Sequence, residues 1–215
     1  MMLNWTVIAA FITFAFLHSL TVSRVFKNFL SGIIGENRMR AYYRLGFTVF
    51  SAITALAAFY IIWTQPDHTL YRPPQYISIP ARIVQVFGVL IFLSSSKIIH
   101  PGAFMGVRQA MNYLKTGETA GDIEGIENTG LVTWGVYGLV RHPMYLAGIL
   151  VFLFEPVITA NNLALRVLAA LYFLFGTFIE ERRFLHDFGD EYAAYRREVP
   201  RLNIIAGIAR KIRRP

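Results

Sequence analysis

The sequence from residue 141 to residue 181, RHPMYLAGILVFLFEPVITANNLALRVLAALYFLFGTFIEE, contains the pattern that decides the fold. Two apolar runs, 144–160 and 163–179, are joined at Asn161 and Asn162. Each run approaches the length of about 20 helical residues that crosses a hydrocarbon layer. Neither run alternates apolar and polar residues with the period of two that a half-buried strand shows. They predict a hairpin of two membrane-spanning helices whose far ends meet at one face of the bilayer.

Three further apolar runs lie upstream, at 3–22, 45–63 and 83–99. The whole chain is 55% hydrophobic and only 16% charged, and its mean hydropathy is +0.45, whereas about a quarter of the residues of a soluble domain are charged. Helices are expected rather than an open sheet, because lipid cannot satisfy unpaired backbone groups. The sequence therefore predicts an all-α, polytopic membrane helix bundle with about five transmembrane helices.

The basic residues predict how this bundle is oriented. Eighteen of the 21 lysines and arginines lie at the C-terminal ends of the first, third and fifth apolar runs or after them, and the remaining three lie on the other side. Basic residues concentrate in cytosolic loops, so we expect the N-terminus outside and the C-terminus in the cytosol. The net charge of +8 is then explained by orientation, and we expect no nucleic-acid partner.

These patterns divide the chain into four expected parts. Residues 1–99 would hold three transmembrane helices, and residues 100–140 a cytosolic connecting segment. Residues 141–201 would form the C-terminal hairpin with a cytosolic extension, and residues 202–215 a basic tail. We expect the membrane lipid bilayer to be the principal partner.

The composition also excludes several kinds of chemistry. The chain has no cysteine, which excludes disulfides, thiolate-ligated zinc, iron–sulfur clusters and a cysteine nucleophile. Its five histidines lack the spacing of metal ligands. We therefore expect no metal site.

Polar residues that suit a ligand site stand at both ends of the predicted hairpin. Pro143 is suited to a first helical position, which places His142 at the helix start, where free N–H groups favour an anion. At the other end, Glu180 and Glu181 oppose the dipole of a helix C-terminus and need a cationic partner. Arg141, His142 or a cationic ligand can supply one. The alternative is an ordinary helix start and a solvated helix end, with the two glutamates paired locally to the arginines that follow them.

Several blocks of this region carry a family resemblance. The blocks are Gly135-Val136-Tyr137, Arg141-His142-Pro143-Met144-Tyr145, Glu180-Glu181, Phe188-Gly189-Asp190-Glu191-Tyr192 and Val199-Pro200-Arg201. In order and spacing they resemble the C-terminal half of the integral-membrane methyltransferases, a group that includes isoprenylcysteine carboxyl methyltransferases and phospholipid N-methyltransferases. Upstream, residues 104–109 resemble a short element of the methanethiol S-methyltransferase branch.

The resemblance implies S-adenosylmethionine as the methyl donor, bound at the cytosolic end of the hairpin. It implies a small lipophilic or lipid-anchored acceptor of one of three kinds: a thiol, a prenylcysteine carboxylate or an amine. The implied catalytic residues are Arg201 and Glu181. The implied cofactor-binding residues are Tyr137, Arg141, His142, Pro143, Tyr145, Glu180, Glu181 and Tyr192.

Two other functions remain open at the level of sequence. Membrane sterol reductases, which use NADPH, have a similar C-terminal block, but Met144 and residues 146–148 replace the residues those enzymes commonly carry. A non-enzymatic membrane protein that kept the hairpin is the other alternative. Binding of NADPH or of S-adenosylhomocysteine would distinguish the two enzyme classes.

Overall fold

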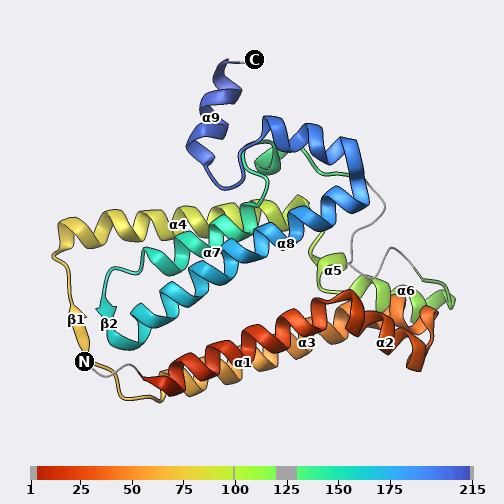
Figure 1. Cartoon of the computed structure of the whole chain (residues 1–215), viewed down its shortest axis with the longest axis horizontal. Helices are drawn as coiled ribbons and strands as arrows, with labels where there is room; N and C mark the ends of the chain where they lie inside the picture. The colour runs from red at the N-terminus through yellow and green to blue at the C-terminus, as the bar shows by residue number, and fades with distance from the viewer. Residues whose placement is uncertain (1–3, 99, 120–129, 214–215) are drawn as a thin grey trace. The chain divides into compact units, whose positions relative to one another are not determined.

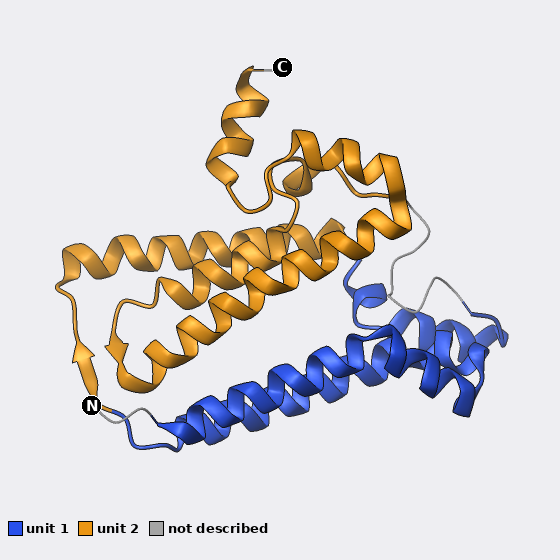
Figure 2. Ribbon diagram, in the orientation of Figure 1, with its two compact units in different colours: residues 1–67, 99–129 blue, residues 68–98, 130–215 orange. Residues whose placement is uncertain are grey.

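The computed structural model describes residues 4–98, 100–119 and 130–213, which form two compact units (Figure 2). Unit 1 comprises residues 1–67 and 99–129, and unit 2 comprises residues 68–98 and 130–215. Helices dominate the described part of the chain (Figure 1). Four of the helices described are long and apolar enough to cross a membrane. The predicted all-α membrane bundle is confirmed.

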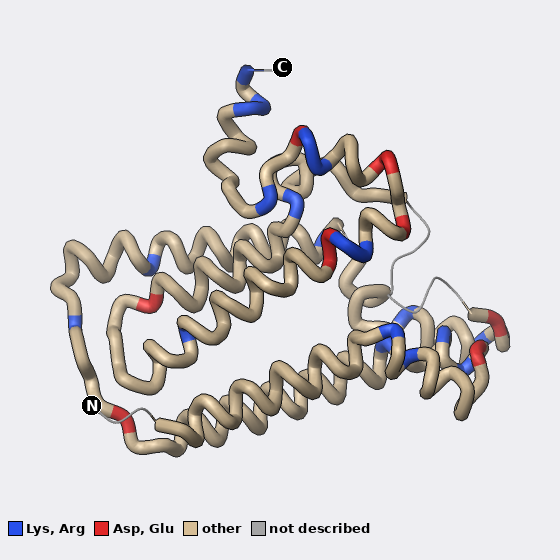
Figure 3. The backbone as a smooth tube through the Cα atoms, in the orientation of Figure 1, with Lys and Arg blue, Asp and Glu red and all other residues tan. Residues whose placement is uncertain are grey.

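Unit 1 is built on two long helices that pack against each other. Its described helices are α1 (Trp5–Val22), α2 (Arg24–Ile34), α3 (Glu36–Trp63), α5 (Pro101–Phe104) and α6 (Val107–Thr116). α2 and α6 both pack on α3. Neither α1 nor the stretch 45–63 of α3 carries a charged residue (Figure 3), which suits lipid. Beside the α5–α6 corner, a Cβ on Gly106 would lie 2.2 Å from the backbone nitrogen of Leu45, so only glycine permits this approach.

Unit 2 contains the C-terminal hairpin and the helix that supports it. In chain order its elements are β1 (Thr69–Tyr71), α4 (Gln75–Ile98), the 3₁₀ helix η1 (Gly135–Gly138), α7 (Pro143–Leu153), β2 (Ile158–Thr159), α8 (Ala160–Glu198) and α9 (Ile204–Arg213). α7 packs against both α4 and α8. A small core of Ile91, Val140, Leu146 and Ala147 joins α4 to the start of α7.

The first helix of the hairpin is shorter than the sequence predicts. α7 ends at Leu153 rather than near residue 160, and its 11 residues rise only about 16 Å. The reason is Pro156, which disfavours helical geometry at Glu155 and lacks a backbone donor. The chain instead forms β2, which pairs antiparallel with β1, and Glu155 forms a bidentate ion pair with Arg82 of α4 at 2.6 and 2.9 Å.

The predicted turn at Asn161 and Asn162 is also displaced. Both residues lie in the first turn of α8, where Thr159 and Asn162 form a reciprocal capping box. The α8 helix then extends well beyond the predicted run 163–179, and it changes direction at Gly189, whose φ and ψ are 52° and −124°. This break is accessible to glycine and strained for other residues. It turns the last part of α8 back, so that the chain after Glu198 returns to the start of α7.

Candidate active site

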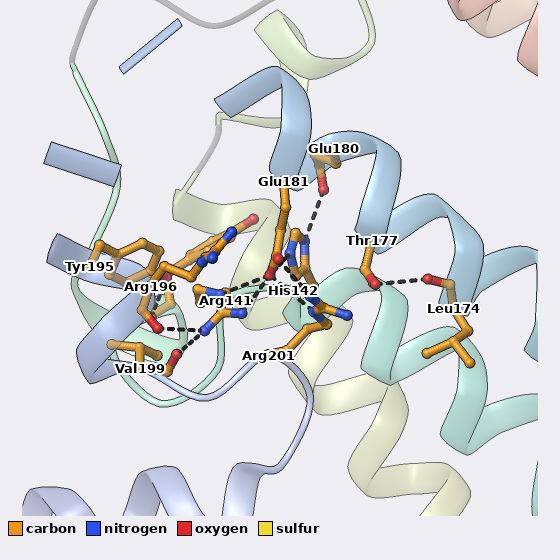
Figure 4. Close-up of polar contacts among 11 residues, drawn as sticks. Arg141, His142, Leu174, Thr177, Glu180, Glu181, Tyr195, Arg196, Val199 and Arg201 are labelled. Atoms are coloured by element: carbon orange, nitrogen blue, oxygen red, sulfur yellow. Dashed lines mark hydrogen bonds and ion pairs between the residues drawn. The ribbon is translucent and has the colours of Figure 1, made fainter. Parts of the chain in front are cut away.

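The two ends of the α7–α8 hairpin lie together in unit 2 (Figure 4). His142 is the N-cap of α7 and Pro143 is its first residue. The His142 ring lies between two carboxylates of α8, with Nδ1 3.0 Å from Glu180 Oε2 and Nε2 3.3 Å from Glu181 Oε1. Its side chain is only 1% exposed. A neutral imidazole donates to one of the two carboxylates, and a doubly protonated one donates to both.

Glu181 accepts hydrogen bonds from two guanidinium groups. Arg141 donates to Glu181 Oε1 from Nε at 3.0 Å and from Nη2 at 2.5 Å. Arg201 donates to the same carboxylate from Nε at 3.1 Å and from Nη2 at 2.7 Å. The Glu181 side chain is 4% exposed. Because both of its oxygens are already engaged by arginines, Glu181 acts as an anchor that holds other residues in place.

The residues after α8 complete this arrangement through their backbone. The amide of Arg141 donates to the carbonyl of Pro200 at 3.0 Å, and the amide of His142 donates to the carbonyl of Arg201 at 3.2 Å. Arg141 Nη1 also donates to the carbonyls of Arg196, at 2.9 Å, and Val199. The end of α8 and the start of α7 are therefore bound to each other, and the amides of Arg141 and His142 are not free for a ligand.

Glu180 is the more open of the two carboxylates. Its side chain is 26% exposed, and besides His142 it has a 3.7 Å ion pair with Arg183. Arg201 is open to a similar extent, at 30%, and its guanidinium lies 4.0 Å from the centre of the Phe178 ring. A cationic or hydroxyl-bearing ligand can therefore approach Glu180, and an anionic one can approach Arg201.

The tyrosines predicted to contact a cofactor occupy different environments. The Tyr145 ring lies edge-on to His142 at 5.7 Å between centroids. It also covers Gly176, where a Cβ would lie 2.6 Å from its Cε1 atom. Tyr192 is 1% exposed and packs against Phe184 and Tyr195. In this structure Tyr192 has no open ring face for a ligand.

Tyr137 is half-buried in η1, and its carbonyl accepts a 2.6 Å hydrogen bond from the hydroxyl of Tyr195. Burial, with a smaller contribution from the negative charge of Glu180, raises the pKa of the Tyr137 hydroxyl above its ordinary value. The hydroxyl therefore stays protonated at physiological pH and can only be a neutral donor or acceptor. Sequence reasoning missed Tyr195, because nothing in its spacing indicates a bond to a residue so far away in the chain.

Residues 84–191, half of the chain, match the model of the phospholipid methyltransferase family. The chain belongs to this family. Its curated relatives include a methanethiol S-methyltransferase of Pseudomonas deceptionensis, which is 28% identical over 189 residues, covering 86% of this chain and 67% of the relative. One from Mycobacterium tuberculosis strain H37Rv is 30% identical over 195 residues, covering 88% and 73%. Methanethiol S-methyltransferase 1 of Bradyrhizobium diazoefficiens strain USDA 110 is 28% identical over 196 residues, covering 88% and 62%.

As a member of the phospholipid methyltransferase family, the protein is an integral membrane methyltransferase. The family implies S-adenosylmethionine as the methyl donor. The reductase alternative is not favoured by these relatives. The match includes α7 and the side chains of Arg141, His142, Glu180 and Glu181, whereas Arg201 and the carbonyls of Arg196, Val199 and Pro200 lie beyond residue 191. No solved structure matches the chain.

Proposed function

We propose that this methyltransferase binds S-adenosylmethionine at the cytosolic end of the α7–α8 hairpin and methylates a small thiol. The proposal rests above all on the His142 ring, which joins the partly open Glu180 to the buried Glu181. One carboxylate is thereby available to a ligand while its neighbour fixes the surrounding side chains. The cytosolic location rests on the distribution of basic residues.

The chemistry of the residues around Glu180 suits a donor that carries an ammonium, a sulfonium and two ribose hydroxyls. Glu180 can accept hydrogen bonds from the ammonium or the ribose, because about a quarter of its side chain is exposed. The rings of Tyr137 and Tyr145 can face the sulfonium, an attraction of about 0.5 to 2 kcal/mol that increases with desolvation. The amides of Met144 and Tyr145, in the first turn of α7, can hold the donor's carboxylate.

The buried network has a positioning role in this proposal. Glu181 holds both Arg141 and Arg201 through its carboxylate, and Arg141 in turn binds the backbone at the end of α8. The side chains of Arg141 and Glu181 are both buried, at 8% and 4% exposure. They therefore act on a ligand through His142 and Arg201, whose positions they determine.

Arg201 is the residue suited to the acceptor. Its guanidinium is partly exposed, and it lies over the Phe178 ring, which provides an apolar surface beside the charge. A thiolate held there would be stabilised electrostatically. When bound, the donor would supply the methyl group to the thiolate sulfur and leave as the neutral thioether, and Arg201 would hold that sulfur in position. The site residues contribute alignment and charge stabilisation, with no covalent intermediate on the protein.

Several curated relatives are named methanethiol S-methyltransferases, and this favours a small thiol among the possible acceptors. A prenylcysteine carboxylate and an ethanolamine-type amine are the acceptors to compare with it. The purified protein in detergent, supplied with S-adenosylmethionine, should methylate a small alkyl thiol and leave the other two unchanged. Methylation of only the amine or only the carboxylate would overturn the choice of thiol while leaving the methyltransferase assignment intact.

Donor binding is tested separately, by calorimetric titration of S-adenosylhomocysteine. The wild type should bind, and Glu180→Gln should bind at least tenfold more weakly, because the only partly open carboxylate of the network is lost. Arg197→Gln is a suitable control, since Arg197 is exposed on the last turn of α8 and has no part in the network. Unchanged affinity in Glu180→Gln, in folded protein, would refute the assigned role of Glu180. NADPH should not bind.

A further inference from the structure

The C-terminal helix α9 has one face that is docked against the rest of unit 2. Gly207 on this face is buried, and a Cβ there would lie 1.9 Å from the carbonyl oxygen of Leu139. Arg210 donates to the carbonyl of Gly138 at 2.6 Å and lies 3.6 Å from a carboxylate oxygen of Glu198. α9 is therefore held against the segment that leads into Arg141, and its orientation is defined.

The opposite face of α9 is apolar and exposed. Ile205 is 78% exposed, Ile208 41% and Ile212 74%. Their spacing of three and four residues places them on one side of the helix. With 3.6 residues per turn, the exposed Lys211 and Arg213 fall on either side of this isoleucine face. No acidic residue occurs in α9, so the exposed charges of this face are all positive.

The direction of α9 fits this distribution of side chains. Within unit 2, α9 runs across the direction of α4, α7 and α8 (Figure 1). α4 and α8 are candidate membrane spans, so a helix crosswise to them lies along the membrane plane. Amphipathic helices with lysine and arginine beside an apolar face lie in the membrane interface, with the apolar face about 5–10 Å into the headgroup and acyl boundary.

We propose that the outer face of α9 binds a membrane surface containing anionic phospholipids. Ile205, Ile208 and Ile212 enter the boundary with the acyl chains, and Lys211 and Arg213 contact the phosphate groups. Charge complementarity identifies the occupant, because the negative potential of an anionic surface attracts both cations and a surface without net charge does not. Since the inner face is docked on residues 138 and 139, this contact also holds the entry to α7 at the membrane surface.

The absence of cysteine makes a direct test straightforward. Single cysteines at Ile205 and Ile212 carry a polarity-sensitive dye in the full-length protein, reconstituted in vesicles of phosphatidylcholine with or without phosphatidylglycerol. In the anionic vesicles both dyes should emit at blue-shifted wavelengths and be quenched by doxyl-labelled lipids. A dye at Glu191, an exposed acidic position of α8, should report water in both mixtures.

The charge contribution is tested with paired variants in the Ile212→Cys background. Lys211→Gln with Arg213→Gln should lower the equilibrium constant for docking of α9 on the membrane about fivefold for each charge removed. The dye signal should then no longer differ between the two lipid mixtures. Arg196→Gln with Arg197→Gln removes the same charge from the last turn of α8 and should leave the dye signal unchanged. Equal losses in both pairs would mean that overall charge, and not α9, is responsible, and would overturn the proposal.

Two other outcomes would also overturn it. Water-like emission without lipid quenching at both isoleucine positions would show that α9 projects into solvent. Blue-shifted emission that is insensitive to both doxyl lipid and a soluble quencher would show that protein, such as a second copy of this chain, covers the face.

Discussion

Replacing Glu181 with glutamine should destabilise the folded protein far more than the same change at its neighbour. Glu181 is 4% exposed and carries the hydrogen bonds of Arg141, itself 8% exposed, and of Arg201. Glu181→Gln leaves the charge of Arg141 buried without a counterion. Removing one partner of a buried ion pair costs about 3–5 kcal/mol. We expect the lower end, about 3 kcal/mol by that scale, because Arg141 keeps two carbonyl acceptors and Arg201 can turn to solvent.

Glu180→Gln is the matched control for this substitution. Glu180 is 26% exposed, its contact with Arg183 is long, at 3.7 Å, and a glutamine there can still hydrogen-bond the His142 ring, so the loss should stay within the 1 kcal/mol or so that exposed pairs contribute. The free energy of unfolding is measured by denaturant titration in detergent micelles for both variants. A difference of about 2 kcal/mol follows from these two costs.

A double-mutant cycle isolates the ion pair itself. Arg141→Gln and Glu181→Gln should each destabilise the protein, and the double variant should be destabilised by less than the sum of the two, with a coupling energy within the usual 0.5–3 kcal/mol for contacting residues. The reasoning fails if the single substitution at Glu181 is no worse than that at Glu180, or if the two effects in the cycle simply add.

Three glycine substitutions test the close packing of unit 2: two lie in tight contacts, and the third lies in open space and serves as the reference. Gly207→Ala places a Cβ 1.9 Å from the Leu139 carbonyl oxygen, so we expect a loss of about 1–3 kcal/mol in unfolding free energy and faster proteolysis within α9. Gly32→Ala, where nothing lies within 4 Å of the new Cβ, should instead stabilise α2 by up to about 1 kcal/mol; equal effects at the two positions would contradict the packing argument. Gly176→Ala would push the Tyr145 ring aside, since its Cε1 atom lies 2.6 Å from the added carbon. It should weaken S-adenosylhomocysteine binding about tenfold, which is about 1.4 kcal/mol, and unchanged affinity would show that Tyr145 does not contact the ligand.

The start of α7 illustrates what local sequence can predict. Pro143 at the first helical position and His142 at the N-cap follow from the conformational preferences of proline alone, and the structure has both. The end of the same helix was predicted wrongly. The hydropathy of the run continues to residue 160, whereas Pro156 and the pairing of β2 with β1 stop the helix at Leu153. Hydropathy measures compatibility with lipid, and it does not register a backbone break within an apolar run.

The adjacent glutamates show the limit of sequence for the site. Sequence places Glu180 and Glu181 beside Arg141 and His142 by counting residues around a hairpin, but this count alone does not show which carboxylate is buried and which is open. Neighbouring residues on a helix point about 100° apart, and here that rotation turns Glu181 toward Arg141 and Arg201 while Glu180 keeps an exposed edge. The hydrogen bonds from the amides of Arg141 and His142 to the carbonyls of Pro200 and Arg201 have no sequence signature at all.

Membrane residence and helical class were settled by composition, because a chain with so few charges and such long apolar runs can satisfy its backbone in lipid only as helices. The differences in burial and hydrogen bonding among the residues of the polar network were decided only by the folded chain. Burial and hydrogen-bond partners depend on which side chains come together from α7, α8 and the segment after it. These parts are far apart in the sequence, so only three-dimensional packing brings them together and no local pattern shows it.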